Sequence, residues 1–573
     1  MKKRHSQPKF IALFVALNVT PAAFAGQVYS GVDYQYFRDF AENKGKFTPG
    51  AQNIEVVNKK GESVGTMMQN APMMDFSVVS RNGVAALVGD QYIVSVAHNV
   101  GYSGVDFGME GSNPDQHRFG YNIVKRNNYK NDSTHPYMTD YHNPRLTKFV
   151  TEAAPIEMVS KMQGSTYGDL EKYPMRVRIG SGWQFLRDDN DNGNHIAMAY
   201  NYLTAGNTFM QGWANNGEVS LSGDVRHPNQ YGVLPISGSS GDSGSPMFIY
   251  DKTAGKWLLN GVLRTGHPYQ GKENTYQIAR KNYLDEIIAR DLVTVFEPTA
   301  ASYDWATDGN GSGTLTKGSR VVTTTPLANY SLPSSGRDES FGYGGPNPYM
   351  PAQHHGKNIY FGNMQSGTIT LKNNIDQGAG GLTFEGDFVV QPTTDETWKG
   401  AGVSVGEGST VTWKVKNPAG DRLSKIGQGT LLVNGKGENL GDISVGDGVV
   451  VLNQQADEQG KKQAFNQLGI VSGRPTVKLE SADQVNPNNI YFGFRGGRLD
   501  LNGNALTFNR IHLSKRQGGS RGGVSHSHGK QGFHGICART FGAGVAGARR
   551  RGRAPRADIC DRGQSLQVER LAV

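Results

Sequence analysis

Short apolar runs, separated by clusters of Gly, Asn and Asp, make up most of this chain of 573 residues. Runs of four to nine residues that end at turn-forming residues are typical of β-strands. The composition agrees with this pattern, because the chain has 76 glycines against 24 prolines and glycine favours tight turns. We therefore predict an all-β protein, long enough for several domains.

Residues 1–25 have the three parts of a secretory signal peptide. The start is basic, and Phe10–Leu17 is apolar but much shorter than the ~20 helical residues that cross a bilayer. Ala23 and Ala25 then supply the small residues that signal peptidase requires before Gly26. We expect export into the periplasm, with a buried amino-terminal helix as the alternative, and no stable membrane insertion.

Residues 26–298 are predicted to form one β-barrel-type domain that a helix closes. The expected strands are Val84–Val88, Gln91–Ala97, Pro246–Tyr250 and Lys256–Leu263. The one convincing helical pattern is Lys281–Leu292, in which Tyr283, Ile287, Ile288 and Leu292 recur at helical spacing.

Residues 299–513 differ in style, because shorter alternating strands follow one another between tight turns. The expected strands are Thr368–Leu371, Leu382–Val390, Ser409–Val415, Gly429–Val433, Gly441–Val445, Gly448–Leu452 and Leu506–Ile511. Such strands suit a parallel β-helix, in which each coil buries its apolar side chains by stacking on its neighbours. We predict the start of a right-handed parallel β-helix, with Trp413 and Phe384 in its core. A β-sandwich is the alternative.

Residues 514–573 form a basic tail that holds all of the chain's net charge. The tail has 12 Lys+Arg and 3 Asp+Glu, whereas the rest of the chain has 47 of each, out of totals of 59 and 50. A basic excess confined to one tail argues against a nucleic-acid partner and favours a disordered segment. Because the strand pattern stops abruptly here, we also consider that the tail is translated out of frame.

Composition excludes several other classes of function. Hydrophobic residues make up only 36% and mean hydropathy is −0.51, which excludes a polytopic membrane protein. Both cysteines, Cys537 and Cys560, lie in the tail, so neither a disulfide framework nor a cysteine metal site is expected. The acidic run 187–195 lacks the glutamate of a calcium loop and is better explained as a hairpin turn at Asn192-Gly193. We expect no metal and no cofactor.

The segment Gly241–Pro246, Gly-Asp-Ser-Gly-Ser-Pro, is the sharpest chemical signal. A serine hydroxyl is a weak nucleophile until a neighbouring base activates it and a tight turn presents it. Glycines permit such a turn, and the backbone N–H groups of Gly241 and Ser243 are candidate donors to an oxyanion. Ser243 is the candidate nucleophile.

A histidine and an acidic residue that could activate this serine lie earlier in the chain. His98 follows an apolar strand, where an imidazole can face a cleft as a general base. Asp140 could orient that imidazole, although spacing alone leaves Asp106 and Asp132 open. The chain order His, Asp, Ser is that of the chymotrypsin-like β-barrel proteases.

Several long segments resemble the IgA-protease-type serine autotransporters, and within them the adhesion-and-penetration type. The resemblance is carried by Asp33–Val56, Asp75–Val88, Asp140–Met158, Gly241–Asp251, Asp376–Phe388, Asp421–Leu431 and Tyr491–Gly503. It implies a trypsin-like double β-barrel with the triad His98, Asp140 and Ser243. Family members continue into a longer stem and a carboxy-terminal barrel, so we expect this chain not to export itself beyond the periplasm, whereas full-length relatives reach the surface or are secreted.

The resemblance says less about substrates. In trypsin-like folds the floor of the primary pocket lies six residues before the nucleophile, here Ser237, and we add Arg264 to this pocket. Because position 237 carries no carboxylate, we expect the substrate side chain that enters this pocket to be small or apolar. We expect a serine endopeptidase, whose partners are protein substrates. Candidates are immunoglobulin, host surface or matrix proteins, and the chain's own passenger. The alternative function is an adhesin whose stem binds host cells.

Overall fold

The computed structural model describes most of the chain after residue 25. The described residues are 26–99, 102–108, 119–129, 140–215, 217–227, 232–238, 240–266, 273–297, 300–308, 312–326, 329–330, 353–354, 356–362, 366–493, 495–508, 512–513, 535–537, 558–560 and 570–572. The predicted signal peptide lies outside them, as does most of the predicted tail. None of the described helices has the length and apolar content needed to cross a membrane.

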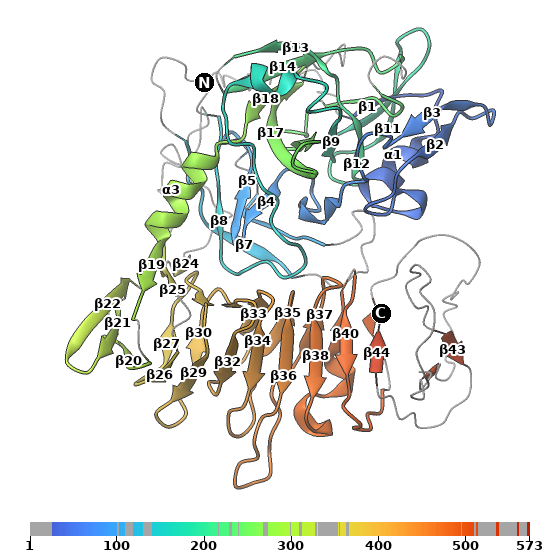
Figure 1. The fold of residues 1–573 in the computed structure, drawn as a ribbon. Helices are drawn as coiled ribbons and strands as arrows, with labels where there is room; N and C mark the ends of the chain where they lie inside the picture. Colours follow the sequence, from blue (N-terminus) through green and yellow to red (C-terminus); the bar gives the residue numbers. More distant parts are fainter. Residues whose placement is uncertain are drawn as a thin grey trace, which may run out of the picture.

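Two antiparallel sheets form the body of the amino-terminal domain, in the upper part of Figure 1. The first has the order β4-β5-β8-β7-β6. Its strands are β4 (Ala86–Gly89), β5 (Tyr92–Val94), β6 (Gly104–Val105), β7 (Tyr121–Lys125) and β8 (Arg145–Leu146).

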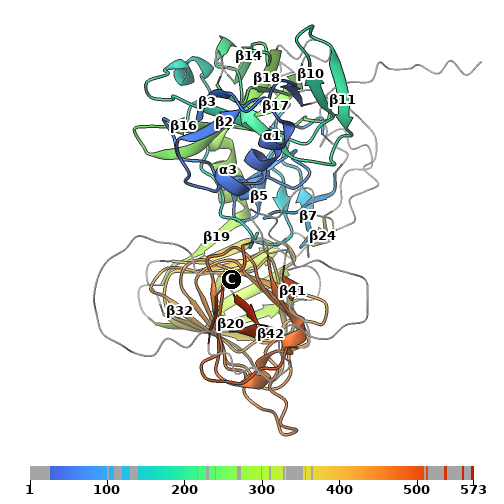
Figure 2. The same cartoon turned by 90° about the vertical axis from the view of Figure 1, so that its right-hand side faces the viewer.

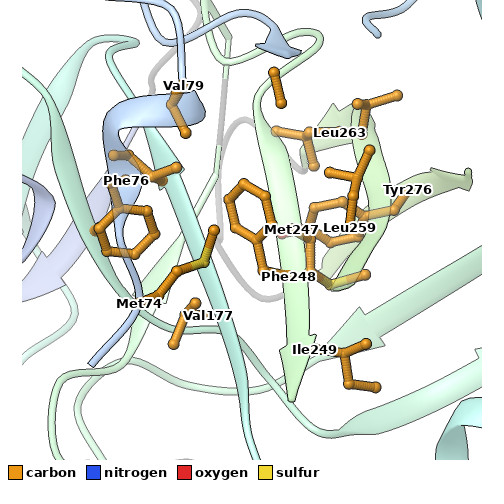
Figure 3. Packing of buried hydrophobic residues seen from close by; sticks show 14 of the residues in the cluster. Met74, Phe76, Val79, Val177, Met247, Phe248, Ile249, Leu259, Leu263 and Tyr276 are labelled. Carbon is orange, nitrogen blue, oxygen red and sulfur yellow. The ribbon is translucent and has the colours of Figure 1, made fainter. Parts of the chain in front are cut away.

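The second sheet has the order β12-β9-β16-β17-β18-β14-β13. Its strands are β9 (Arg176–Gly180), β12 (Thr204–Asn207), β13 (Gln211–Ala214), β14 (Glu218–Ser222), β16 (Pro246–Asp251), β17 (Lys256–Gly266) and β18 (Glu273–Ile278). Its β16 supplies Met247, Phe248 and Ile249, all fully buried, to the core in Figure 3. Phe248 lies 6.0 Å from Phe76, ring centre to ring centre, which joins the segment before β4 to this sheet.

Smaller sheets complete the domain. A four-stranded sheet has the order β11-β10-β1-β15, and β2 pairs with β3. These strands are β1 (Gln27–Tyr29), β2 (Ile54–Val57), β3 (Ser63–Met67), β10 (Gln184–Arg187), β11 (Gly193–Ala197) and β15 (Ile236–Ser237). β10 and β11 form the hairpin predicted at Asn192-Gly193.

The described residues of this domain include two α-helices, and sequence patterns predicted only one. Helix α3 (Lys281–Asp291) confirms the prediction almost to the residue. Helix α1 (Tyr34–Ala41) was missed, although the Asp33 side chain caps it by accepting a hydrogen bond from Gln35. With Phe37, Phe40 and Ala41 buried, α1 has an apolar face of little more than two turns, too short to stand out among the strand patterns.

The second half of the chain is a parallel β-helix, seen below the first domain in Figures 1 and 2. One of its sheets has the parallel order β19-β25-β28-β31-β33-β35-β37-β39-β41. These strands are β19 (Leu292–Val295), β25 (Asn358–Phe361), β28 (Leu382–Phe384), β31 (Val403–Val405), β33 (Arg422–Ile426), β35 (Asp442–Val445), β37 (Leu468–Ile470), β39 (Ile490–Phe492) and β41 (His512–Leu513).

The other long sheet has the order β22-β21-β20-β26-β29-β32-β34-β36-β38-β40-β44. Its strands are β20 (Ala301–Thr307), β21 (Ser312–Lys317), β22 (Arg320–Pro326), β26 (Gly367–Leu371), β29 (Phe388–Pro392), β32 (Thr410–Trp413), β34 (Thr430–Val433), β36 (Val449–Leu452), β38 (Thr476–Leu479), β40 (Arg498–Asp500) and β44 (Arg570–Ala572). Three two-stranded pairs add β23 (Asn329–Tyr330) with β24 (Gln353–His354), β27 (Ile375–Asp376) with β30 (Trp398–Lys399), and β42 (Gly535–Cys537) with β43 (Asp558–Cys560).

Stacked side chains of successive coils fill the β-helix. The rings of Phe361 and Phe384, at matching positions of neighbouring strands, are 5.0 Å apart and nearly parallel. Trp413 is buried, as predicted, and packs edge-on against Trp398 at 5.5 Å. A continuous stacked core of this kind rules out the β-sandwich alternative.

Two predicted strands of this region were wrong in detail. The run 382–390 is two strands, β28 and β29, because residues 385–387 turn a corner of the coil between them. Residues 506–508 follow Leu501 without strand structure, and 509–511 lie outside the described residues. Alternation continues through a corner in the sequence, so it does not reveal where one strand ends and the next begins.

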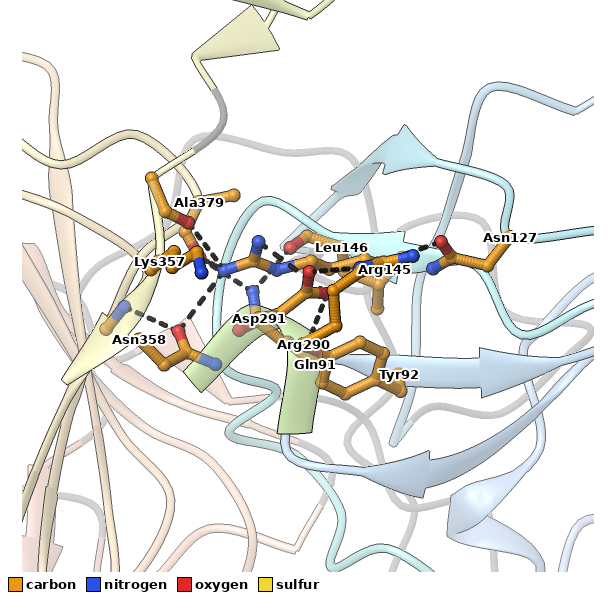
Figure 4. A network of polar contacts seen from close by, with 12 residues as sticks. Gln91, Tyr92, Asn127, Arg145, Leu146, Arg290, Asp291, Lys357, Asn358 and Ala379 are labelled. Carbon is orange, nitrogen blue, oxygen red and sulfur yellow. Dashed lines mark hydrogen bonds and ion pairs between the residues drawn. The ribbon is translucent and has the colours of Figure 1, made fainter. Parts of the chain in front are cut away.

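The first domain packs against the side of the β-helix through polar contacts (Figure 4). A guanidinium nitrogen of Arg145 donates to the carbonyls of Gly356 and Ala379, at 2.8 and 2.9 Å. The Gln91 amide also donates to Ala379 O, at 2.9 Å. Farther along, Lys148 Nζ lies 2.6 Å from Asp421 Oδ1. Because Arg145, Gln91 and Ala379 are buried, separating the two parts would expose these donors together with their acceptors.

Candidate active site

His98 and Asp140 come from two segments that pair with each other. The backbone groups of Ser95 and His142 exchange two hydrogen bonds of 3.1 Å, which sets the end of β5 beside the segment before β8. His98 Nδ1 then lies 2.7 Å from Asp140 Oδ2, while the His98 backbone N–H donates to Asp140 Oδ1 at 2.9 Å. The carboxylate thus contacts both the ring and the main chain of the histidine, which fixes the ring's orientation.

Ser243 lies in the turn between β15 and β16. Its Oγ is 2.7 Å from His98 Nε2, and the Asn99 side-chain amide donates to its carbonyl oxygen at 3.0 Å. Asp140 is only 2% exposed, whereas about a fifth of the His98 side chain is exposed. The hydroxyl, imidazole and carboxylate therefore stand in hydrogen-bonding order, with the carboxylate innermost.

Buried contacts of Asp242 hold this turn from behind. Asp242 is fully buried, and its carboxylate lies 3.1 Å from a guanidinium nitrogen of Arg178, which is also fully buried. It accepts hydrogen bonds from the backbone N–H groups of Gly182, at 2.8 Å, and Gly26, at 3.2 Å. The first residue after the predicted signal peptide therefore contacts the residue next to Ser243.

Two glycines give the turn its shape. Gly241 and Gly244 have φ angles of +88° and +83°, a region that residues with a Cβ rarely adopt. A Cβ on Gly244 would lie 2.3 Å from the Val84 carbonyl oxygen, so only glycine fits. The backbone N–H groups of Gly241 and Ser243 belong to this turn, as the motif requires.

Arg264, assigned to the specificity pocket, lies beside the acidic residue of the site. Its Nε is 3.8 Å from Asp140 Oδ2, and Nη1 is 3.2 Å from Glu218 Oε1. Burial raises the pKa of Glu218, although the charge of Arg264 opposes this shift. Ser237, the expected pocket floor, is fully buried, and its hydroxyl accepts a hydrogen bond from the Asn274 amide at 3.2 Å.

A second histidine, His142, lies beneath the site. It is fully buried, with Nε2 3.0 Å from the Tyr102 hydroxyl and Nδ1 3.3 Å from Asn128 Oδ1. Burial above all, and then the charge of Arg126, holds the pKa of this imidazole well below its usual range. His142 is therefore neutral, which spares the site a second positive charge near His98.

The competing candidates of the sequence lie elsewhere. Asp106 pairs with Arg81 at 3.4 Å, and Asp132 lies outside the described residues. Asp188 accepts hydrogen bonds from the backbone of Asn190 and Asn192, as expected of a hairpin turn. Among the described residues, no group of His, Cys, Asp and Glu is arranged to hold a metal ion.

The first domain is similar to a known family of proteins. The model of one family, Peptidase S6, described as immunoglobulin A1 protease, matches residues 25–282. Over these residues the chain is similar to the immunoglobulin A1 protease family. The match covers the segments that carry Asp140, His98 and Ser243. The fold of the chain is similar to that of the passenger domain of an Escherichia coli autotransporter, plasmid encoded toxin, with a TM-score of 0.61 and 22% identity.

Curated relatives extend the similarity into the β-helix. An adhesion and penetration protein autotransporter from Haemophilus influenzae is 59% identical over 517 residues, which is 89% of this chain and 37% of that protein. An immunoglobulin A1 protease autotransporter from the same species is 43% identical, over 88% of this chain and 31% of the relative. The chain thus spans about a third of the length of these relatives.

A solved structure, the Haemophilus influenzae Hap adhesin, matches with a TM-score of 0.80 and 58% identity. The match covers 86% of this chain and 53% of that one. The resemblance inferred from the sequence segments is therefore confirmed.

Sequence reasoning missed several residues that support the site. Asn99 directly follows His98, and its amide could have been considered as a contact to the nucleophile's turn. Arg178 and Gly26 gave no signal, because their contacts to Asp242 join segments that are far apart in the chain.

Proposed function

We propose that this chain is a serine endopeptidase that cleaves polypeptides through an acyl-enzyme intermediate. The observation that carries the proposal is the unbroken series from Asp140 through His98 to Ser243, with two contacts of 2.7 Å. The similarity of residues 25–282 to the immunoglobulin A1 protease family supports the same activity.

The proposed mechanism assigns one role to each residue. Ser243 Oγ attacks the scissile carbonyl carbon while His98 Nε2 takes the hydroxyl proton. Asp140 holds the ring and stabilises the imidazolium, and the N–H groups of Gly241 and Ser243 bind the oxyanion. His98 returns the proton to the departing amine, which leaves an ester on Ser243. Water then attacks the ester with His98 again as the base, which releases the acid and restores the hydroxyl.

The primary pocket is proposed to lie around Ser237 and Arg264. Ser237 offers a hydroxyl at its floor, and the charge of Arg264 is already engaged with Asp140 and Glu218. This arrangement supports a small or apolar side chain before the scissile bond rather than Lys or Arg. Protein substrates are proposed on the same grounds, and export by residues 1–25 would bring the enzyme into the periplasm.

An adhesin is the second candidate function, because relatives that match both parts of the chain carry that description. One is named for adhesion and penetration, and the matching solved structure is titled an adhesin. In this case the β-helix would be the binding surface.

The variant Ser243→Ala separates the two candidates. We expect it to lose hydrolysis of a denatured protein substrate by several orders of magnitude while binding of the chain to cultured epithelial cells is kept. Thermal unfolding at an unchanged temperature would show that the variant is folded. Full hydrolysis by the variant would rule out the proposed mechanism.

A further inference from the structure

In the first domain, one segment of five residues exposes three large apolar side chains. Ile196, Met198 and Tyr200 are 38%, 57% and 48% exposed, and we call them the 196–200 ridge. Single exposed apolar residues are common on protein surfaces and need no explanation. A group of three does, because clustered apolar exposure usually marks a place where another molecule binds.

The ridge adjoins the turn that carries Ser243. Ala199, between its last two members, is close enough that its Cβ would lie 3.3 Å from a Cβ on Gly241. The same Cβ would lie 3.7 Å from Trp183 Cδ1. The absence of a side chain at Gly241 is therefore what lets the ridge approach the catalytic turn so closely.

Backbone contacts anchor the ridge to this turn. The N–H of Tyr200 donates to Ser181 O at 2.5 Å, and the N–H of the next residue, Gly182, donates to Asp242 at 2.8 Å. Tyr200 itself has a φ of +67°, a conformation that a bulky side chain rarely adopts. Strained residues of this kind persist where the surrounding structure demands them, and they cluster at functional sites.

The position of the ridge indicates which part of a substrate would reach it. The far end of the catalytic turn is bonded to β17, through Gly244 N–H to Leu263 O and Leu263 N–H to Ser245 O, both at 2.8 Å. β17 leads on to Arg264 and the proposed primary pocket, which takes the side chain before the scissile bond. Ala199, within the ridge segment, lies beside the opposite end of the turn, at Gly241, so the ridge lies toward the leaving half of the substrate.

We propose that the 196–200 ridge is a substrate-binding surface that selects apolar side chains in the one to three residues after the scissile bond. The inference rests on the proposed endopeptidase function and deepens it. The occupant is the leaving half of a polypeptide, because this ridge is continuous with the turn that performs the chemistry. Because the three ridge side chains carry no charge, they would bind the substrate through apolar contact.

The test uses pairs of quenched fluorescent peptides built on a sequence that the enzyme cleaves. Within each pair the half before the scissile bond is constant, and the three residues after it are either Leu, Phe and Val or Ser, Asn and Thr. We expect the intact enzyme to favour the apolar member by roughly tenfold or more in kcat/KM. The measured quantity is this ratio, which a loss of active molecules leaves unchanged.

Two variants probe the ridge and one serves as control. Tyr200→Asn suits the left-handed backbone, and Met198→Gln keeps a similar length, so both should fold. Each is expected to bring the ratio down toward 1. Leu170→Gln changes an equally exposed apolar residue (54%) that lies outside the ridge, and its ratio should stay that of the unaltered enzyme.

Other outcomes are distinguishable. Provided that a fluorophosphonate still labels Ser243, either of two results would overturn the inference. One is an unaltered enzyme without the apolar preference, and the other is a set of ridge variants that keep it. Ridge variants that weaken self-association in sedimentation without changing the ratio would instead assign the ridge to a contact between copies of the chain. Absence of both labelling and cleavage would mean that the proposed function itself is wrong.

Discussion

The carboxylate of Asp140 contacts His98 twice, at the ring Nδ1 with one oxygen and at the backbone N–H with the other, at 2.7 and 2.9 Å. The imidazole is thereby held toward Ser243 in one orientation. Asp140 is thus a positioning residue that also faces the charge that forms on His98 during the proposed reaction.

Replacing Asp140 by Asn tests this relationship. The amide keeps the size of the side chain but favours the wrong imidazole tautomer, so we expect kcat to fall by roughly 10⁴. Peptide hydrolysis measures the effect, and circular dichroism checks the fold. An activity within tenfold of the unaltered enzyme would show that another group orients His98.

Gly244→Ala should be far more harmful than the same change at an open turn. A Cβ at Gly244 would collide with the Val84 carbonyl oxygen at 2.3 Å, whereas Gly255 has a similar φ of +66° and nothing within 4 Å. We expect Gly255→Ala to cost about 1 kcal/mol of unfolding free energy, and Gly244→Ala to cost more and to abolish fluorophosphonate labelling. Equal melting temperatures for the two variants would contradict the account of the turn.

The contact between Gly26 and Asp242 predicts that removal of residues 1–25 strengthens the catalytic turn. A chain that begins at Gly26 carries a charged amino group at the nitrogen that lies 3.2 Å from the buried carboxylate. We expect this chain to be labelled faster by a fluorophosphonate than a chain that keeps residues 1–25. Asp242→Asn should remove the difference between the two forms, and a difference that survives it would have another origin.

Lys425 is predicted to be a structural lysine of the β-helix. Burial lowers its pKa to about 7, and Nζ donates to the carbonyls of Gly427, Gly429 and Asp447 at 2.6 to 2.8 Å. Lys425→Met leaves these carbonyls without that donor and should cost roughly 2–5 kcal/mol. Lys436→Met is the matched control, because Lys436 is exposed and should change stability by less than about 0.5 kcal/mol. Equal urea midpoints for the two variants would disagree with this role.

We expect acid to weaken the contact between the first domain and the β-helix, with Asp291 as the group that titrates. Burial alone would raise the pKa of this carboxyl, but the Arg290 hydrogen bond and the charge of Arg145 outweigh it and lower the pKa below its usual 3.8. The charged form therefore adds stability at pH values above about 3.8, and this stability is lost as the pH falls through the lowered value. We expect the difference in melting temperature between the unaltered chain and Asp291→Asn to shrink between pH 5 and pH 2. A constant difference would contradict this origin.

Much of the site could be predicted from the sequence, since Ser243 lies in a short motif and His98 and Asp140 in segments that resemble one family. The contacts behind the site could not. Arg178 of β9 meets Asp242 in the turn before β16, and Arg145 reaches Ala379 from another domain, so no local pattern records either pair. Helix α1 and the corner at 385–387 were missed for a different reason, because both are shorter than the stretch of sequence over which a periodic pattern can be recognised.

Labelling with a fluorophosphonate, read by intact mass and peptide mapping, is the most direct test of the central claim. The account predicts one adduct per chain, on Ser243, formed at a rate that falls at least a hundredfold in His98→Ala. An adduct on another serine, or equal labelling with and without the imidazole, would contradict the claim that these three residues act together.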